Sequence, residues 1–289
     1  NRFAYNKNGQ LSQAANDHND VRFEYTPTGQ LSKESQNEQE ITHAYNPQGK
    51  RVSTTLPNQK TIAYDYGDNQ QWNNVSFDGN NVSTLERNAW GQETQRTQGT
   101  LNTHTDYDIM GRLTQQRVTG QQSKQQIIQR QYQYNDAGNL SVIDDFRKGV
   151  TEYQYDSLDR LKTANGYAQE QFAFDPAGNL LDTAANDTNT SSQVKGNRLQ
   201  FQGDRKFEYD NAGNLVKENR GKGGKLETIY QYNKQNQLVS INNGKQSTRY
   251  SYDALGRRIA KEDAFGTTLF LWNGDVLLSE TRNHSEKLY

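Results

Sequence analysis

A ten-residue pattern recurs along most of this chain and constrains its fold more than any other feature. Its clearest copy, YSYDALGRRI, runs from Tyr250 to Ile259. Aromatic residues at i and i+2 place their rings on one face of a strand, because successive side chains alternate between faces. The Asp, two free positions and Gly that follow are typical of a tight turn in which Gly supplies a positive φ. Each copy therefore predicts a strand, a turn and a second strand.

Eleven copies can be aligned on the turn position, and ten of them also carry the aromatic residue. The predicted turn positions are Gly9, Gly29, Gly49, Gly91, Gly111, Gly138, Asp159, Gly178, Gly213, Asn236 and Gly256. The predicted aromatic ladder is Tyr5, Tyr25, Tyr45, Tyr107, Tyr134, Tyr155, Phe174, Tyr209, Tyr232 and Tyr252. The copy at Gly91 has Arg87 in place of the aromatic residue. Asp and Asn replace Gly at two turns, and they are among the non-Gly residues that best tolerate a left-handed backbone.

The composition separates this chain from an ordinary globular domain. Only 31% of its residues are hydrophobic and the mean hydropathy is −1.14, which leaves little material for a thick core. Disorder normally requires high net charge and few aromatic residues, whereas this chain has a net charge of −1 with 17 Tyr and 10 Phe. A repeat-built antiparallel sheet that is wetted on both faces fits these values. We therefore predict an all-β hairpin strip with no significant helix.

One repeat region is predicted over residues 1–289, with an irregular part at 61–106 and a long rim loop at about 183–198. The short Gly-containing segments between copies are predicted to form turns at the second edge of the strip. They are Lys148-Gly149, Asn165-Gly166, Gly221 to Lys225 and Asn243-Gly244. Because both ends fall inside strand-like runs, we expect the chain to be a piece of a longer polypeptide.

Several classes of function are disfavoured by simple absences. The chain has no Cys, so disulfides and thiolate metal sites are excluded. The near-neutral charge gives no signal for a nucleic-acid partner. No apolar run approaches the roughly 18 residues of a membrane-spanning helix, and no signal peptide opens the chain.

The candidate chemical residues are better explained as structural ones. His18, His43, His104 and His284 are scattered and form no metal-binding motif. Asp144-Asp145, Asp182 and Asp187 lack the alternating ligand frame of a calcium loop, and acidic residues are common in turns. The Gly-rich segment from Gly221 to Lys225 lacks the frame of a phosphate loop. We therefore predict no catalytic, cofactor-binding or metal-binding residue, and assign the periodic aromatics to ladder packing rather than to base or sugar stacking.

The repeated Tyr-Asp-x-x-Gly-Arg-Leu pattern resembles the YD repeat of the Rhs (rearrangement hotspot) family, which is shared with the C component of insecticidal toxin complexes and with teneurins. Finer segments are similar to the bacterial Rhs core: Tyr66-Gly67, Asn74 to Gly79, Arg96 to Leu101, Gly196 to Leu199 and Leu269 to Asp275. The resemblance implies a spiralling sheet that forms part of a hollow shell around a C-terminal toxic domain. The Asp-Pro-x-Gly-Leu-like self-cleaving segment of polymorphic Rhs toxins is absent from this sequence, so self-cleavage is assigned to no residue here.

The resemblance also implies a setting and partners. The protein would be a type VI secretion effector in competition between bacteria, made in the cytoplasm and then secreted or delivered to a cell surface. Its partners would be its own C-terminal toxin, the remaining Rhs core, a secretion spike protein and an immunity protein.

The number of repeats also sets the size of the strip. Eleven units of two strands at about 4.8 Å per strand give a strip roughly 105 Å around. One turn of that size is too narrow for a folded cargo of about 34 Å diameter, so we expect a wall section completed by further repeats.

Two other classes of function stay open at this stage. An adhesion or glycan-binding module would use exposed aromatic rings on the sheet to hold sugars, and it predicts saturable glycan binding. An enzyme such as a polysaccharide lyase would need acid and base groups that converge in a groove.

Overall fold

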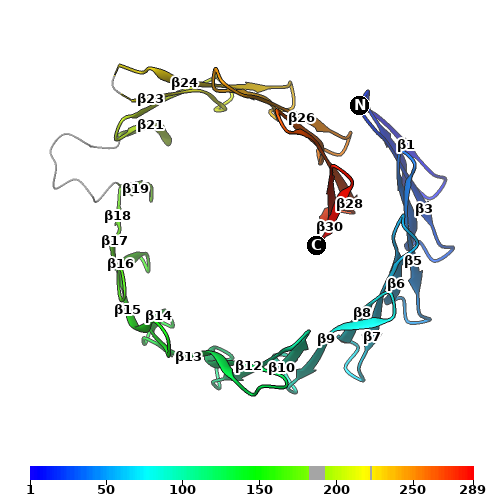
Figure 1. The fold of residues 1–289 in the computed structure, drawn as a ribbon, viewed down its shortest axis with the longest axis horizontal. Coiled ribbons are helices and arrows are strands. Elements are labelled where there is room, and N and C mark those ends of the chain that lie inside the picture. Colours follow the sequence, from blue (N-terminus) through cyan, green and yellow to red (C-terminus); the bar gives the residue numbers. More distant parts are fainter. Residues whose placement is uncertain (182–192, 222) are drawn as a thin grey trace. The chain divides into compact units, whose positions relative to one another are not determined.

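The computed structural model describes residues 1–181, 193–221 and 223–289, and every regular element in these ranges is a β-strand (Figure 1). The prediction of an all-β hairpin protein without helix is confirmed. None of the described residues belongs to a helix that could cross a membrane.

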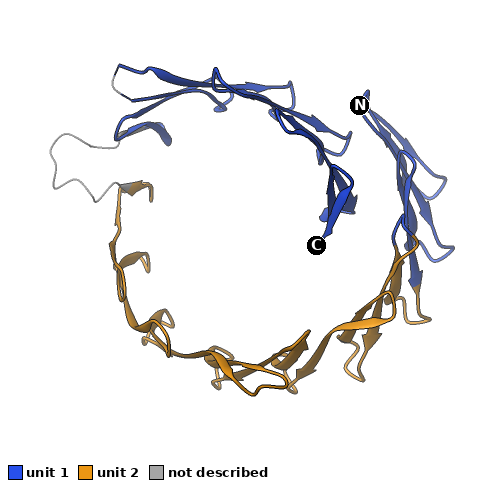
Figure 2. Ribbon diagram, viewed as in Figure 1, with its two compact units in different colours: residues 1–44, 56–58, 184–289 blue, residues 45–55, 59–183 orange. Residues whose placement is uncertain are grey.

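The contacts group the chain into two compact units (Figure 2), and unit 1 comprises residues 1–44, 56–58 and 184–289. Its first strands are β1 (Arg2–Tyr5), β2 (Leu11–Ala15), β3 (Asp20–Tyr25), β4 (Leu31–Gln36) and β5 (Gln39–Tyr45). Its later strands are β20 (Gln193–Lys195), β21 (Arg198–Gln202), β22 (Arg205–Tyr209), β23 (Leu215–Arg220), β24 (Leu226–Tyr232), β25 (Leu238–Asn242), β26 (Ser247–Tyr252), β27 (Arg258–Asp263), β28 (Gly266–Asn273), β29 (Val276–Arg282) and β30 (Ser285–Leu288).

Unit 2 comprises residues 45–55 and 59–183 and is built from the same kind of hairpin. Its strands are β6 (Arg51–Thr55), β7 (Thr61–Tyr66), β8 (Trp72–Phe77), β9 (Asn80–Arg87), β10 (Glu93–Gln98), β11 (Leu101–Tyr107), β12 (Leu113–Gly120), β13 (Gln126–Tyr134), β14 (Leu140–Asp145), β15 (Gly149–Tyr155), β16 (Leu161–Asn165), β17 (Gln169–Gln171), β18 (Ala173–Phe174) and β19 (Leu180–Leu181).

Each strand pairs antiparallel with the next strand in the chain within the runs β1–β5, β6–β17, β18–β19 and β20–β30. The register shifts by one residue at the repeat aromatic. In the β26–β27 pair, for example, Ser251 faces Ala260 but Tyr252 faces Arg258. A bulge of this kind bends a strand and increases its twist, so the repeat contains its own source of curvature.

The predicted bounds of the rim loop are wrong in part. The rim loop was placed at about 183–198, but Lys195 pairs with Arg198 across a tight turn between β20 and β21. Gly196 and Asn197 both have positive φ there, so the turn closes a hairpin; residues 182–192 lie outside the described part of the chain. The Asn165-Gly166 pair lies at the end of the β16–β17 hairpin, where Asn165 pairs with Gln169 and the loop has three residues.

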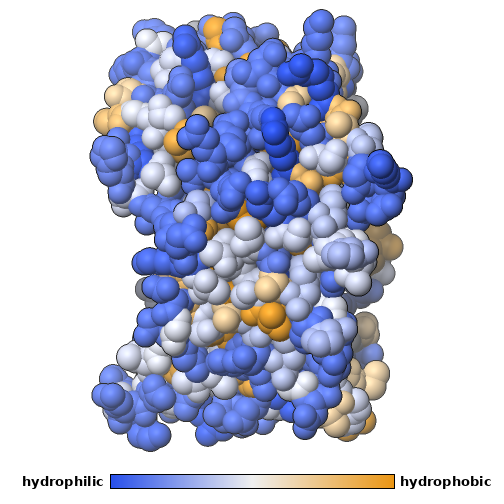
Figure 3. All heavy atoms as spheres, turned by 90° about the vertical axis from the view of Figure 1, so that its right-hand side faces the viewer, coloured by the Kyte–Doolittle hydropathy of each residue, from blue (hydrophilic) through white to orange (hydrophobic). Residues whose placement is uncertain are grey.

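Little apolar material is buried, as the composition predicts. The buried hydrophobic residues are Ala14, Ala15, Val21, Ile41, Leu56, Leu85, Val118, Ala164, Ala254 and Leu278, and an even longer set of polar residues is buried beside them. On the face shown in Figure 3, hydrophilic residues cover most of the surface and hydrophobic ones are scattered in small groups. Backbone pairing and polar contacts therefore carry much of the order in this fold.

Candidate functional site

The repeated turn has a constant hydrogen-bond pattern, seen clearly in the Asp253 copy. The Asp253 N–H donates to the Arg257 carbonyl (3.0 Å), and the Gly256 N–H donates to the Asp253 carbonyl (3.1 Å). The Asp253 carboxylate accepts the N–H groups of Leu255 and Arg257 at 3.0 and 2.9 Å. An Asn or Asp side chain thus fixes the turn by bonding to backbone two and four residues later.

All eleven turn positions named from the sequence have positive φ, from 58° at Asn236 to 92° at Gly213. The structure contains a further turn of this type that the sequence analysis missed. Gln70 has a φ of 59°, and its N–H donates to the Gly67 carbonyl at 2.9 Å. The turn was overlooked because Gln gives no signal for a left-handed backbone. The segment read as irregular therefore carries the same hairpin unit.

The aromatic ladder is tied to the backbone through its hydroxyl groups. In copy after copy, the Tyr hydroxyl donates to the carbonyl two residues beyond the preceding turn position. The pairs are Tyr25 to Leu11, Tyr66 to Arg51, Tyr107 to Glu93, Tyr134 to Leu113, Tyr155 to Leu140, Tyr209 to Leu199 and Tyr252 to Leu238, all at 2.8 or 2.9 Å. Burial raises the pKa of the Tyr134 and Tyr155 hydroxyls above the ordinary value for tyrosine.

At two ladder positions, a residue other than Tyr donates the equivalent hydrogen bond to the backbone carbonyl. The Trp272 indole N–H donates to the Arg258 carbonyl at 2.8 Å, and the Arg87 guanidinium reaches the Trp72 carbonyl at 3.5 Å. Tyr5 stands at the first turn with 62% of its surface exposed. The remaining members are in place in their strands: Tyr45 ends β5, Phe174 ends β18 and Tyr232 ends β24.

Replacing Tyr134 by Phe is expected to lower the free energy of unfolding by about 1 kcal/mol, because the Leu113 carbonyl loses its donor while the ring stays. Urea denaturation followed by circular dichroism measures this value. Tyr5→Phe is the matched control, and we expect almost no change there because that ring is largely exposed. Equal losses at both positions would show that the hydroxyl bond adds nothing.

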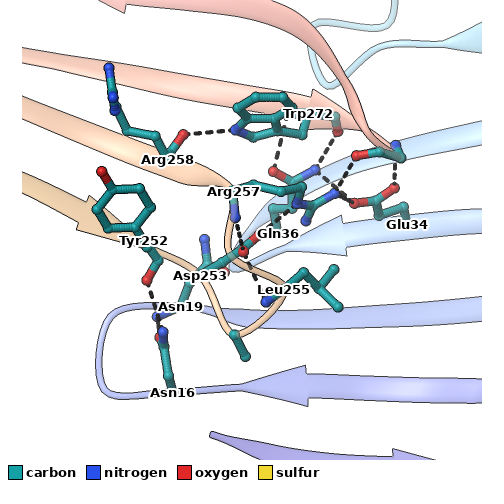
Figure 4. A network of polar contacts seen from close by, with 12 residues as sticks. Asn16, Asn19, Glu34, Gln36, Tyr252, Asp253, Leu255, Arg257, Arg258 and Trp272 are labelled. Atoms are coloured by element: carbon teal, nitrogen blue, oxygen red, sulfur yellow. Dashed lines mark hydrogen bonds and ion pairs between the residues drawn. The ribbon is translucent and has the colours of Figure 1, made fainter. Parts of the chain in front are cut away.

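A buried polar cluster joins two parts of unit 1 that are far apart in sequence (Figure 4). We call it the clasp, and its members are Glu34, Gln36, Asp253, Arg257, Trp272 and Gly274. The Arg257 Nη1 atom lies 2.7 Å from Glu34 Oε1 and donates to the Gly274 carbonyl at 2.7 Å. Its Nε atom donates to Asp253 at 2.7 Å. The side chains of Glu34 and Asp253 are fully buried and that of Arg257 is 7% exposed.

Backbone groups complete the clasp. The second Glu34 oxygen accepts the Gly274 N–H at 3.0 Å. The amide side chain of Gln36 bonds to the Trp272 backbone in both directions, accepting its N–H at 3.2 Å and donating to its carbonyl. Next to the clasp, Asn16 donates to the Tyr252 carbonyl at 2.8 Å. Strands β2 and β4 are thereby held against the turns that precede β27 and β29.

The clasp is a buried charged contact between strands and turns of unit 1. Both carboxylates face one guanidinium whose position is fixed by the turn, and charges removed from water are tolerated only when they are paired. The Nη2 atom of Arg257 is buried without a hydrogen-bond partner among the described residues. The sequence analysis included Asp253 and Arg257 in its reference repeat but missed Glu34 and Gln36. The sequence around Glu34 does not predict its burial, because an isolated Glu in a polar strand is normally expected to be exposed to solvent.

The acidic pair at 144–145 is divided between two environments. Asp145 is buried, and its carboxylate contacts Arg130 Nε at 2.6 Å and accepts the N–H groups of Arg147 and Lys148 at 2.9 and 3.1 Å. The Arg130 guanidinium, aided by these two N–H groups, lowers the pKa of Asp145 from 3.8 to about 2. Asp144 is exposed. Asp145 therefore fixes a turn and forms an ion pair; the sequence analysis had considered the turn but not the ion pair.

The lowered pKa of Asp145 gives a prediction about pH. Because the folded-state pKa lies below the unfolded value, this stabilisation is present above about pH 4 and is lost as the pH falls toward 2. The shift corresponds to about 2 kcal/mol. Asp145→Asn should remove that part of the pH dependence of unfolding between pH 5 and pH 2, measured by urea titration, while Asp144→Asn should leave it unchanged. An unaltered pH profile in Asp145→Asn would contradict this assignment.

Among residues 1–181, 193–221 and 223–289, the other candidates from the sequence lie in turns and strands. No group of three or more His, Asp or Glu side chains gathers there as a metal site would require. His18 and His284 lie in turns, and His43 and His104 lie in strands β5 and β11. In the Gly-rich segment, the Gly224 N–H donates to the Gly221 carbonyl at 2.9 Å in the turn between β23 and β24, and the Gly221 N–H donates to Asp204 at 3.1 Å. Asp182 and Asp187 lie outside the described residues.

Comparison with known proteins places this architecture. The family model Teneurin YD-shell matches residues 96–287. Double-stranded DNA deaminase toxin A of Burkholderia cenocepacia is 34% identical over 261 residues, which cover 82% of this chain and 18% of that protein. Probable deoxyribonuclease RhsB of Dickeya dadantii is 30% identical over 220 residues, which cover 70% of this chain and 15% of that protein.

A solved structure of similar fold is the TcdB2-TccC3-Cdc42 crystal structure. Its TM-score is 0.66 at 14% sequence identity, and the match covers 96% of this chain and 19% of that one. The chain thus spans less than a fifth of the length of the relatives that it matches. On its repeats, its fold and these matches, the chain belongs to the YD-shell family, as an Rhs-type YD-repeat segment.

Proposed function

We propose that these residues form a section of the wall of a protein shell that encloses a toxic C-terminal domain. The observation that carries this proposal is the clasp, in which Arg257 and Glu34 join hairpins separated by 223 residues in sequence. Buried contacts of this kind join hairpins of unit 1 into one continuous piece of wall. A strip that only displayed a binding face would need no such seal.

The relatives support the same role. Their names describe a DNA deaminase toxin and a probable deoxyribonuclease, and this chain matches less than a fifth of each. We infer that such an activity belongs to a domain outside the matched part, and that this chain has none of its own. In this proposal, the partners are the toxic domain and the rest of the Rhs core, with a secretion spike and an immunity protein. The setting is delivery out of a bacterial cell by type VI secretion, in competition with other bacteria.

The glycan-binding alternative receives less support from the contacts. A sugar-binding ladder needs free ring faces and free hydroxyls, yet the ladder hydroxyls donate to backbone carbonyls. Some ring faces are also occupied, since the Arg112 guanidinium lies 4.6 Å from the Tyr134 ring centroid and that of Arg160 lies 4.8 Å from Phe174. Saturable binding to a glycan array by the 289-residue chain would revive this alternative.

Protease protection tests the proposed function. The complete polypeptide that contains these residues is treated with a nonspecific protease, and the survival of its toxic domain is followed by mass spectrometry. We expect the enclosed domain to survive at least tenfold longer than the same domain expressed alone. Equal survival would overturn the proposal.

A further inference from the structure

The arginine and aspartate of the clasp turn recur in two turns of unit 2. In each of the three turns, the Arg that follows the turn position contacts the Asp of its own turn at 2.7 Å through its side chain. The three pairs are Asp108 with Arg112, Asp156 with Arg160, and Asp253 with Arg257. The same local sequence thus builds the same charged fork at three places on the strip.

The surroundings of these forks differ sharply. Arg257 is 7% exposed, and Ala254 at the tip of its turn is 6% exposed. In unit 2, the Arg112 and Arg160 side chains are 35% and 30% exposed. Their turn tips are open to solvent, with Ile109 at 96%, Met110 at 74% and Leu158 at 70% exposure. Large apolar side chains at such exposed positions are typical of a surface that another surface covers.

The guanidinium groups of Arg112 and Arg160 are each held in one orientation by neighbouring side chains. The Asp carboxylate binds one side of each guanidinium, and the ring of the next repeat lies below it, Tyr134 under Arg112 and Phe174 under Arg160. The Nη1 atom of Arg160 also donates to the Asp175 carbonyl at 3.3 Å, as that of Arg257 does to the Gly274 carbonyl while it binds Glu34. Few rotamers are left to lose when a ligand arrives, so binding costs less entropy. In the clasp, the corresponding edge of Arg257 takes the Glu34 carboxylate.

We propose that the turns at 108–112 and 156–160 are docking sites for another section of the same YD-repeat wall, and that each receives a carboxylate as the turn at 253–257 receives Glu34. This inference rests on the proposed function. The occupant is a hairpin end from a part of the polypeptide outside these 289 residues. It carries an acidic residue and, two residues later on the same strand face, an amide residue, as Glu34 and Gln36 do.

Three observations favour this occupant over others. The interface already exists once within unit 1, between Arg257 and Glu34, so the chain demonstrates its chemistry. A carboxylate complements a guanidinium fork in charge and shape. The relatives are more than five times as long as the matched segment, which provides room for further repeats.

Arginine modification tests the proposal without any mutation. Phenylglyoxal reacts with accessible guanidinium groups, and peptide mapping gives a rate for each Arg. The 289-residue chain and the complete polypeptide are compared, the latter with and without its toxic domain. Arg22, which is 67% exposed, is the reactive standard, and Arg257 is the protected one. We expect Arg112 and Arg160 to react in the short chain and to react at least tenfold more slowly in both complete forms.

Each alternative gives a different pattern. Rates at Arg112 and Arg160 that are equal in the short and complete chains overturn the docking proposal. Protection that disappears when the toxic domain is deleted assigns the cover to the cargo, and protection that rises with concentration of the short chain assigns it to a second copy; both overturn the proposal. Failure of the proposed function is read separately, from protease sensitivity of the toxic domain while the arginines stay protected.

Discussion

Arg257→Met should be among the most damaging single substitutions in this chain, lowering the stability of the unit 1 contact by about 3–5 kcal/mol. The change removes the only charge that Glu34 and Asp253 share and leaves two buried carboxylates facing each other. Methionine retains most of the volume, so the loss reports charge and hydrogen bonds rather than a cavity. Breaking a buried pair from one side costs more than the pair itself contributes, because the remaining charge cannot regain water.

Hydrogen exchange measures this effect locally, which suits a repeat protein whose unfolding need not be a single step. The Gly274 and Trp272 N–H groups donate to Glu34 and Gln36, so they report whether the clasp is closed. We expect their exchange to accelerate by at least 100-fold in Arg257→Met. Arg112→Met is the control, since that fork is partly exposed and such pairs contribute about 1 kcal/mol or less. Similar acceleration at these amides in both variants would remove any special role for the clasp.

The local part of the structure could be predicted from the sequence because its chemistry is local. A turn needs a left-handed residue and a side chain that binds the nearby backbone, and both lie within five residues, as in Asp253 to Arg257. The aromatic period gives the strand faces. The repeat therefore predicted the all-β hairpin class, and the low content of hydrophobic residues predicted that few apolar side chains would be buried.

The rest depended on contacts that a repeat pattern does not encode. Glu34 meets Arg257 across 223 residues, and no motif in either segment indicates the other as its partner. The repeat pattern likewise predicts the strands but not the one-residue register shift at Tyr252. Trp272 lies in the Leu269 to Asp275 segment that resembles the Rhs core, but its place in the ladder depends on its indole N–H reaching the Arg258 carbonyl. Gln70 shows that a turn with positive φ can also form without Gly, Asn or Asp at that position, so such a turn is missed when only those residues are sought.

The same turn geometry gives the second large prediction, at Gly213. Its φ is 92°, a value that β-branched residues essentially avoid, and a Cβ added there would lie 3.3 Å from Arg198 Nη2. A left-handed backbone costs a non-Gly residue about 1–2 kcal/mol, and the branched side chain and displaced Arg198 add to that cost. Gly213→Val should therefore lower the free energy of unfolding by about 2–4 kcal/mol in urea denaturation.

Asn236→Gly is the matched control at an equivalent turn, where φ is 58°. Glycine relieves the backbone penalty, but the substitution also removes the Oδ1 atom that accepts the Asn214 side-chain N–H at 2.9 Å. These two effects oppose each other, and an exposed hydrogen bond contributes only about 1 kcal/mol, so the net change should stay within about 1 kcal/mol of zero. If Asn236→Gly destabilised the protein as much as Gly213→Val, the left-handed turn would not be what holds the repeat together, and the side-chain contacts between neighbouring turns would have to take its place.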